Sequence, residues 1–345
     1  MFTTLALALI LAAPVSQPQT PAPSAPAAQA APGPYRVLRT LDIGGEGGWD
    51  IVTVDPDSGR LYVPRSTHVQ VIDTTTGKVV GDIPNTEGVH GVALAMGKGF
   101  TSNGKSGDVT VFDLATLKVL QTVKAGKSPD EIVFEPTTKR ILCFNGHSSD
   151  VTLIDATSLS PVGTIDLGGK PEFAAVARGG KVFVNLEDKS ELLRLDAASM
   201  KVEQRWPLAP GEEPTGLAFD AAHHHLFAAC GNEKMVVLDS DTGKVLATPA
   251  IGQHADGAEF DAAGGFAIAP SGDGTLTIIN AQAPFDVVQT LTTHKGARTL
   301  VQDPKTRHIY LPAADYEEAK EGQRPKMKPG TFKIVVVGPA PVKKS

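Results

Sequence analysis

The sequence is poor in the residues that several protein classes require. Its 345 residues include two cysteines, two tryptophans and 6% aromatic residues, and its formal net charge is −6. Nucleic-acid binding needs a basic surface and aromatic side chains for base stacking, so this composition argues against a nucleic-acid partner. The motifs of a serine nucleophile elbow, a phosphate-binding glycine loop and a zinc-protease helix are also missing. The sequence therefore assigns no catalytic residue.

Long hydrophobic runs are scarce as well, and the one near the N-terminus is short. It extends from Leu5 to Ala13, which suits the core of a signal peptide and is too short to span a bilayer. We expect a signal peptide over residues 1–16, with cleavage there or as late as residue 30, and no membrane span. Residues 17–34 are rich in Pro, Ala, Gln and Ser and should form a disordered leader. Neither cysteine could carry an N-terminal lipid, so we expect a periplasmic or secreted protein.

Amphipathic helices are absent, and a repeated phrase takes their place. The phrase "VIDTTTGKVVGDI" at residues 71–83 recurs in variant form about every 40 residues, anchored on Asp73, Asp113, Asp155, Asp196, Asp239 and Asn280. Each unit holds four short alternating runs separated by Gly, Pro, Asp and Asn, which indicates four strands joined by tight turns. Such units are typical of a β-propeller blade. Seven units can be counted, so we predict an all-β, seven-bladed β-propeller of four-stranded antiparallel blades over residues 35–338, followed by a short tail at 339–345.

The two ends of the chain predict how the ring closes. The last unit has a third strand, "TFKIVVVG", and no fourth, whereas a matching fourth strand precedes the first unit. Residues 35–44 should therefore complete the seventh blade and leave no open edge.

The stretches "LYVPRSTHVQVIDTTTGKVVGDI" and "FTSNGKSGDVTVFDLATLKVLQTV" resemble the YVTN-repeat propellers of the YncE-like family. The resemblance covers residues 35–338 and implies a secreted or periplasmic propeller. It implies little about activity, because similar propellers include lactonases, quinoprotein dehydrogenases and binding scaffolds. The short chain and the lack of an adjacent cysteine pair argue against the dehydrogenase.

One position of the repeat is polar in all seven units. In propellers the first strand of each blade lines the central channel, so these residues should converge at its mouth as a ligand site. A group of carboxylates with few basic partners attracts cations, and a Ca²⁺-like divalent cation is one option, although no cofactor is predicted. The alternative is a set of polar side chains that only face water. The residues are Asp50, His90, Asp130, Glu172, Thr215, Asp256 and Arg298.

A second layer follows the second strands: Arg65, Asn103, Asn145 and Asn185, with Glu187 and Asp188 nearby. The asparagines have a competing role, because asparagine side chains often satisfy backbone groups in turns. Cys143 and Cys230 fall in different blades, too far apart for a bridge, and should be unpaired thiols. The last unit carries an insertion, "DYEEAKEGQRPKMKPG", that should form a surface loop or, alternatively, a lid or docking arm.

These features favour a non-catalytic, monomeric scaffold that binds a small ligand or a protein partner through the mainly acidic channel mouth. The alternative is a lactonase-like, metal-dependent hydrolase that uses the same acidic ring. The sequence does not identify the ligand.

Overall fold

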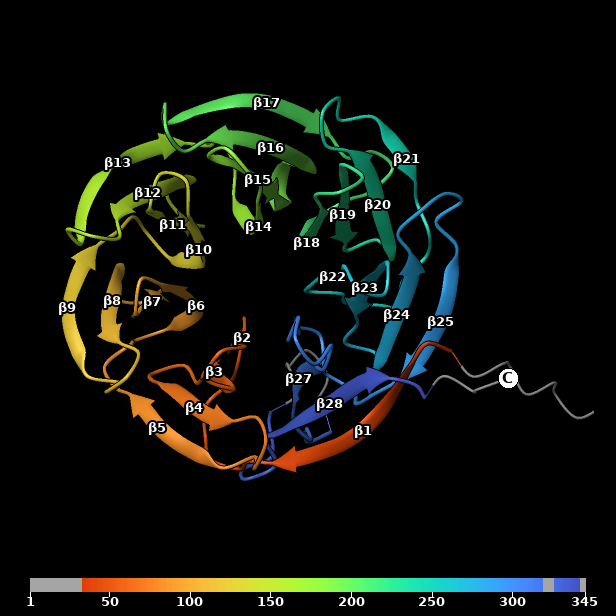
Figure 1. The fold of residues 1–345 in the computed structure, drawn as a ribbon, viewed down its shortest axis with the longest axis horizontal. Coiled ribbons are helices and arrows are strands. Elements are labelled where there is room, and N and C mark those ends of the chain that lie inside the picture. The colour runs from red at the N-terminus through yellow and green to blue at the C-terminus, as the bar shows by residue number, and fades with distance from the viewer. Residues whose placement is uncertain (1–32, 319–325, 342–345) are drawn as a thin grey trace, which may run out of the picture. The chain divides into compact units, whose positions relative to one another are not determined.

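A computed structural model describes residues 33–318 and 326–341. In this part of the chain, seven four-stranded antiparallel sheets stand as blades in a ring around a central channel (Figure 1). The predicted all-β propeller is confirmed. The predicted signal peptide and residues 17–32 of the predicted leader lie outside the described residues, as does part of the insertion in the last unit. The described residues contain no helix long and apolar enough to cross a membrane.

Blades 1 to 4 follow one another along the chain, each running from an inner first strand to an outer fourth strand (Figure 1). Blade 1 comprises β2 (Thr53–Asp55), β3 (Arg60–Pro64), β4 (Val69–Asp73) and β5 (Val79–Ile83). Blade 2 comprises β6 (Val89–Ala95), β7 (Lys98–Asn103), β8 (Asp108–Asp113) and β9 (Val119–Lys124). Blade 3 comprises β10 (Pro129–Glu135), β11 (Arg140–Asn145), β12 (Asp150–Asp155) and β13 (Ser160–Asp166). Blade 4 comprises β14 (Pro171–Val176), β15 (Lys181–Leu186), β16 (Glu191–Asp196) and β17 (Lys201–Pro207), with a short 3₁₀ helix, η1 (Glu187–Lys189), between β15 and β16.

The last three blades complete the ring, and the seventh takes one strand from the start of the chain. Blade 5 comprises β18 (Pro214–Asp220), β19 (His225–Cys230), β20 (Lys234–Asp239) and β21 (Val245–Ala247). Blade 6 comprises β22 (Glu259–Asp261), β23 (Phe266–Pro270), β24 (Thr275–Asn280) and β25 (Val287–Thr292). Blade 7 comprises β26 (Val301–Gln302), β27 (Ile309–Ala313), β28 (Lys333–Pro339) and β1 (Tyr35–Asp42).

The repeated phrase forms the third strand, a turn and the fourth strand of a blade. In blade 1 the carboxylate of Asp73 accepts hydrogen bonds from the backbone N–H groups of Thr75 and Thr76, at 3.1 and 2.7 Å. Gly77 then adopts a positive φ of 70°, a conformation that favours glycine. The same aspartate cap recurs at the end of each third strand from blade 2 to blade 5. The phrase recurs because the third and fourth strands of blades 1 to 5 are joined by this turn.

The hydrophobic core lies between neighbouring blades rather than within any one of them. Second and third strands are almost entirely buried; in blade 2, for example, Phe100 and Val111 pack against Ile132 and Ile141 of blade 3. Fourth strands such as β9 have mostly exposed side chains. Each blade therefore needs both neighbours to bury its faces, which makes closure of the ring essential.

Strand β1 closes the ring, as the sequence predicted. It pairs antiparallel with β28, from Tyr35 opposite Pro339 to Asp42 opposite Lys333. The Tyr35 hydroxyl also donates a hydrogen bond to the Asp261 carboxylate of blade 6, which the Arg307 guanidinium of blade 7 approaches to 2.5 Å. We call Tyr35, Asp261, Arg307 and the nearby Gln302 the seam.

Candidate functional site

Backbone irregularities at the inner ends of the blades position the seven polar residues of the predicted ligand site. In blades 2 to 5, the pairing of the first and second strands skips two residues directly after Val89, Pro129, Pro171 and Pro214. The skipped residues include His90, Asp130, Glu172 and Thr215. Such β-bulges release a residue from the ladder and redirect its side chain, here at the end of the channel that we call the mouth.

In blades 1, 6 and 7 the first strand begins later than the repeat suggests. Here the backbone around the polar residue bonds to a neighbouring blade instead of to its own second strand. Ile51 N–H donates to the carbonyl of His90 at 3.0 Å, and Asp256 N–H donates to the carbonyl of Arg298 at 3.3 Å. Asp50 accepts a hydrogen bond from the Thr299 hydroxyl through its carbonyl oxygen, at 3.0 Å. These bonds tie the mouth residues of adjacent blades together.

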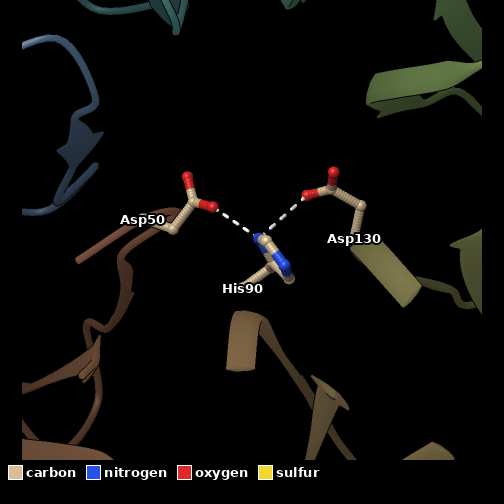
Figure 2. A group of neighbouring side chains, drawn as sticks. All are labelled: Asp50, His90 and Asp130. Carbon is tan, nitrogen blue, oxygen red and sulfur yellow. Dashed lines mark hydrogen bonds and ion pairs between the residues drawn. The ribbon is translucent and has the colours of Figure 1, made fainter. Parts of the chain in front are cut away.

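Three mouth residues from consecutive blades form one cluster. His90 Nδ1 lies 2.6 Å from Asp50 Oδ2 and 3.5 Å from Asp130 Oδ1, and Figure 2 shows both carboxylates pointing at the imidazole. Burial alone lowers the pKa of His90, but the hydrogen bond to Asp50 and the charge of Asp130 outweigh it and raise the pKa to about 9. His90 is therefore an imidazolium ion at neutral pH.

Gly104, directly after β7, makes room for the His90 side chain of this cluster. A Cβ atom at Gly104 would lie 2.7 Å from His90 Nε2, which is closer than such atoms approach. Gly104 thus leaves the space that the imidazole ring occupies.

A second group forms around Glu172. The Lys170 ammonium lies 2.8 Å from Glu172 Oε1 and also contacts the Glu187 carboxylate. Burial and the negative charge of Asp130 nevertheless raise the pKa of Glu172 to about 8. Asp188, the other acidic residue predicted nearby, accepts a hydrogen bond from the backbone N–H of Lys170 at 2.7 Å.

The remaining mouth residues have local partners. Arg298 Nε donates to Asp256 Oδ2 at 2.7 Å. Burial still raises the pKa of Asp256 to about 6, against the opposing charge of Arg298. Burial likewise raises the pKa of Asp130 to about 6 despite the nearby charge of His90. Thr215 is committed to the fold, because its hydroxyl donates to the carbonyl of Ala255 at 3.0 Å.

The predicted second layer is buried, and its donor groups serve the fold. Arg65 donates to the backbone carbonyls of residues 44, 46 and 47 and stacks over Phe332 at 3.9 Å. Asn185 Nδ2 donates to the carbonyls of Thr215 and Gly216 in the next blade. Asn103 and Asn145 each bond an aspartate and a threonine of their own blade: Asp108 and Thr110 for Asn103, and Asp150 and Thr152 for Asn145.

Three ionisable residues of the channel escaped the sequence analysis. Lys170 lies two residues before the repeat column, where the other blades hold Gly48, Gly88, Ser128, Glu213, His254 and Gly296. Glu131 follows Asp130 and is only 6% exposed, and burial raises its pKa well above the usual range. Burial also raises the pKa of Glu259, to about 7. Both glutamates line a separate cavity of about 370 Å³ in the channel. In the column directly after the predicted one, Glu131 is the single charged residue, so comparing neighbouring columns would have identified it.

A larger cavity of about 920 Å³ opens beside the mouth, over blades 1 to 3. Asp50 and His90 border it on one side, and Lys105, Lys127 and His147 border it elsewhere.

Other residues that the sequence singled out do not gather into a site. The two cysteines are free, as predicted. The three consecutive histidines 223–225 each have a different partner: Asp220, Asp241 and the carbonyl of Ala281, respectively. In the insertion, Tyr316 forms a bridge with Met327 in its described part.

Comparison with known proteins supports the fold and goes no further. No family model and no curated protein matches the sequence. Among solved structures, hydrazine synthase of Kuenenia stuttgartiensis superposes with a TM-score of 0.68 at 16% identity, covering 77% of this chain and 92% of that one. The WD40 repeats of RRP9 superpose with a TM-score of 0.73 at 10% identity, covering 89% and 99%. U3-55K gives a TM-score of 0.71 at 11% identity, covering 88% and 98%. The TM-scores indicate a shared seven-bladed propeller fold. Sequence identities this low transfer no activity from these proteins to this chain.

Proposed function

We propose that this protein is an exported, YncE-like binding scaffold whose small ligand presents a positive charge to the channel mouth. The observation that carries the proposal is the charge balance there. Three cationic groups, on His90, Lys170 and Arg298, face five carboxyl groups, on Asp50, Asp130, Glu172, Glu187 and Asp256. Because the pKa of Glu172 is about 8, this group is mostly protonated at neutral pH, and the other four carboxylates still outnumber the three cations.

Burial strengthens the argument, because it leaves the carboxylates poorly solvated. The raised pKa values of Asp130 and Asp256, both about 6, mean that their negative charges are held at a cost in free energy at neutral pH. An arriving cation relieves this cost. A unit charge about 4 Å from a carboxylate gains about 4 kcal/mol at an effective dielectric constant of about 20. A ring of such groups also concentrates cations at the channel entrance.

The test measures binding of simple cations by isothermal titration calorimetry. The probes are alkylamines and the chlorides of Ca²⁺, Mn²⁺ and Zn²⁺, titrated into the wild-type protein and Asp130→Asn. The matched control is Asp286→Asn, which removes the same charge from an exposed site outside the mouth. Binding that is weakened about tenfold by Asp130→Asn and unchanged by Asp286→Asn supports the proposal. Equal binding by all three proteins, or no binding by any, contradicts it.

The Asp50–His90–Asp130 cluster favours a second candidate, a metal-dependent hydrolase of the lactonase kind. The three residues offer ligand atoms within 4.8 Å of one another, a spacing and donor set that fit a divalent cation. A cation held there would polarise the carbonyl group of a substrate. Glu172, with its pKa near 8, would be the group that gives or takes a proton close to neutral pH.

Proton release distinguishes the two candidates. Because ligation requires neutral imidazole, a metal ion must displace the proton that His90 carries below its pKa of about 9. Metal binding at pH 7 should then release about one proton, measurable from titrations in buffers of different ionisation enthalpy. Amine binding does not require neutral imidazole, so it should release no proton from His90. Lactone hydrolysis that depends on added metal and on Glu172 would favour the hydrolase. If no lactone is hydrolysed, the result favours the binding scaffold.

A further inference from the structure

The cavity beside the mouth is lined by one carboxylate, Asp50, which pairs with His90, and by two lysines away from that pair. Its volume is about 920 Å³, enough for a small organic molecule. One side borders the mouth at Asp50, next to the carboxylate-rich ring. Lys105, Lys127 and His147 supply the other charged or titratable side chains of the lining apart from His90.

Neither lysine is neutralised by the protein. Among the described residues, Lys105 and Lys127 form no ion pair, whereas Lys170 contacts two carboxylates. In a chain with a net charge of −6, two unpaired ammonium groups bordering one cavity favour an anionic group.

The backbone of both lysines is fixed between blades. Lys105, in the loop after β7, donates its N–H to the carbonyl of Glu87 at 3.1 Å. Lys127, in the link before β10, donates its N–H to the Ser148 hydroxyl oxygen at 2.9 Å. The Ser148 hydroxyl proton remains available for a carboxylate, because this oxygen acts only as an acceptor in that bond.

Three glycines of the lining allow close packing around the cavity. A Cβ atom at Gly88 would lie 2.7 Å from Lys105 Cγ, and one at Gly126 would lie 2.7 Å from Asn145 Cγ. Gly104 is likewise packed against His90. A larger residue at any of these positions would displace a neighbouring side chain of the lining or its support.

We propose that the ligand of this scaffold is a small zwitterion, whose ammonium group binds the carboxylates of the mouth and whose carboxylate binds Lys105 and Lys127. This inference rests on the proposed function for its ammonium half and adds an independent subsite for its anionic half. Amino acids and short peptides have the required chemistry.

The experiment compares charge arrangements in otherwise similar probes. The zwitterions are ω-amino acids from glycine to 6-aminohexanoate, and each is paired with the alkylamine and the alkanoate of the same chain length. Calorimetric titrations use the wild-type protein, Asp130→Asn, the double variant Lys105→Met/Lys127→Met, and the control Lys78→Met, an exposed lysine at the turn after β4. Thermal unfolding of each protein confirms that it is folded.

We expect one ω-amino acid to bind about tenfold more tightly than its alkylamine, with an optimum chain length that reports the spacing of the subsites. The double lysine variant should lose this gain and keep its affinity for the alkylamine, whereas Lys78→Met should behave as wild type.

The outcomes separate this inference from the proposed function. If the double variant binds the ω-amino acids like wild type while Asp130→Asn loses the alkylamines, the zwitterion is wrong and the cationic mouth stands. If only the alkanoates bind, and the double lysine variant abolishes this binding, the cavity is a site for anions. That result contradicts both the zwitterionic ligand and the cationic ligand of the proposed function. If no probe binds at millimolar concentration, both are overturned.

Discussion

Two aspartates of blade 6, five residues apart in the sequence, have opposite electrostatic environments. Asp261, in the seam, has a side chain only 1% exposed and receives hydrogen bonds from Tyr35 and Arg307. Burial alone would raise its pKa, but these bonds hold the pKa of Asp261 below the usual value. Asp256, in the mouth, has one bond from Arg298, and its pKa is raised to about 6. In addition to burial, the negative charges of Asp50 and Glu187 raise the pKa of Asp256, so the balance of hydrogen bonds and neighbouring charges decides whether ionisation stabilises the fold.

The seam is thus satisfied by the protein itself, and the mouth is not. A depressed pKa means that the ionised Asp261 stabilises the folded state, whereas a raised pKa means that the ionised Asp256 destabilises it. A ligand that supplies the missing partners of such charged groups binds with a favourable free energy. Groups with perturbed pKa values are common at binding sites for this reason.

The largest expected loss of stability comes from breaking the seam. Arg307→Met should leave the buried Asp261 carboxylate without its cationic partner and lower the free energy of unfolding by about 3 kcal/mol. Urea denaturation followed by circular dichroism measures this. A loss below about 1 kcal/mol would mean that the seam does not depend on the ion pair.

The corresponding change at the mouth should act in the opposite direction. Asp130→Asn removes a carboxylate whose pKa is about 6 when folded, against an unfolded value near 3.8. Because ionisation costs the folded state stability as pH rises between those values, the variant should gain about 3 kcal/mol over wild type above pH 7 and nothing below pH 3.5. Unfolding free energies measured across this range check the sign. A variant less stable than wild type at pH 7 would contradict the contrast between mouth and seam.

Within the mouth, His90 owes its charge to its acidic neighbours. Asp50→Asn should remove the main hydrogen-bond acceptor and lower the pKa of His90 from about 9 by about one unit. Nitrogen chemical shifts of the imidazole, followed by NMR during a pH titration, give this value directly. An unchanged pKa would show that Asp130 alone sustains the imidazolium ion.

The smallest effect is expected at an exposed ion pair that also joins blade 7 to blade 1. Lys305 Nζ lies 2.5 Å from Asp57 Oδ1, and both side chains are more than half exposed. Because solvent and salt screen this pair, Lys305→Met should leave the free energy of unfolding unchanged in the same urea assay. A loss comparable to that of Arg307→Met would show that position in the ring, rather than burial, sets the strength of these contacts.

The repeat made most of the fold predictable, because the same turn follows the third strand in blades 1 to 5. The spacing of Asp73 and its equivalents gave the blades, and the missing last strand gave the closure. The column from Asp50 to Arg298 could be read from the same register. The β-bulges that release His90 and Asp130 from the pairing of the first and second strands could not be predicted. They depend on backbone hydrogen bonds that the repeat pattern does not specify.

Contacts between distant residues were also beyond the sequence. Tyr35 and Asp261 are 226 residues apart, and no local pattern links them. Glu131 stands out in the sequence as the one charged residue of its column, but its burial, which raises its pKa, could not be predicted from that column.

The position of β1 at the start of the described chain also determines when the ring can close during synthesis. During synthesis β1 leaves the ribosome first among the strands, yet its partner β28 is the last to be made. Until β28 is made, the most recently completed blade has a neighbouring blade on one side only. The hydrogen-bonding edge of β1 also stays unpaired during this time. The nascent chain therefore cannot complete its ring early. A chaperone that covers β1 through this interval would protect the one strand that must wait for the whole protein.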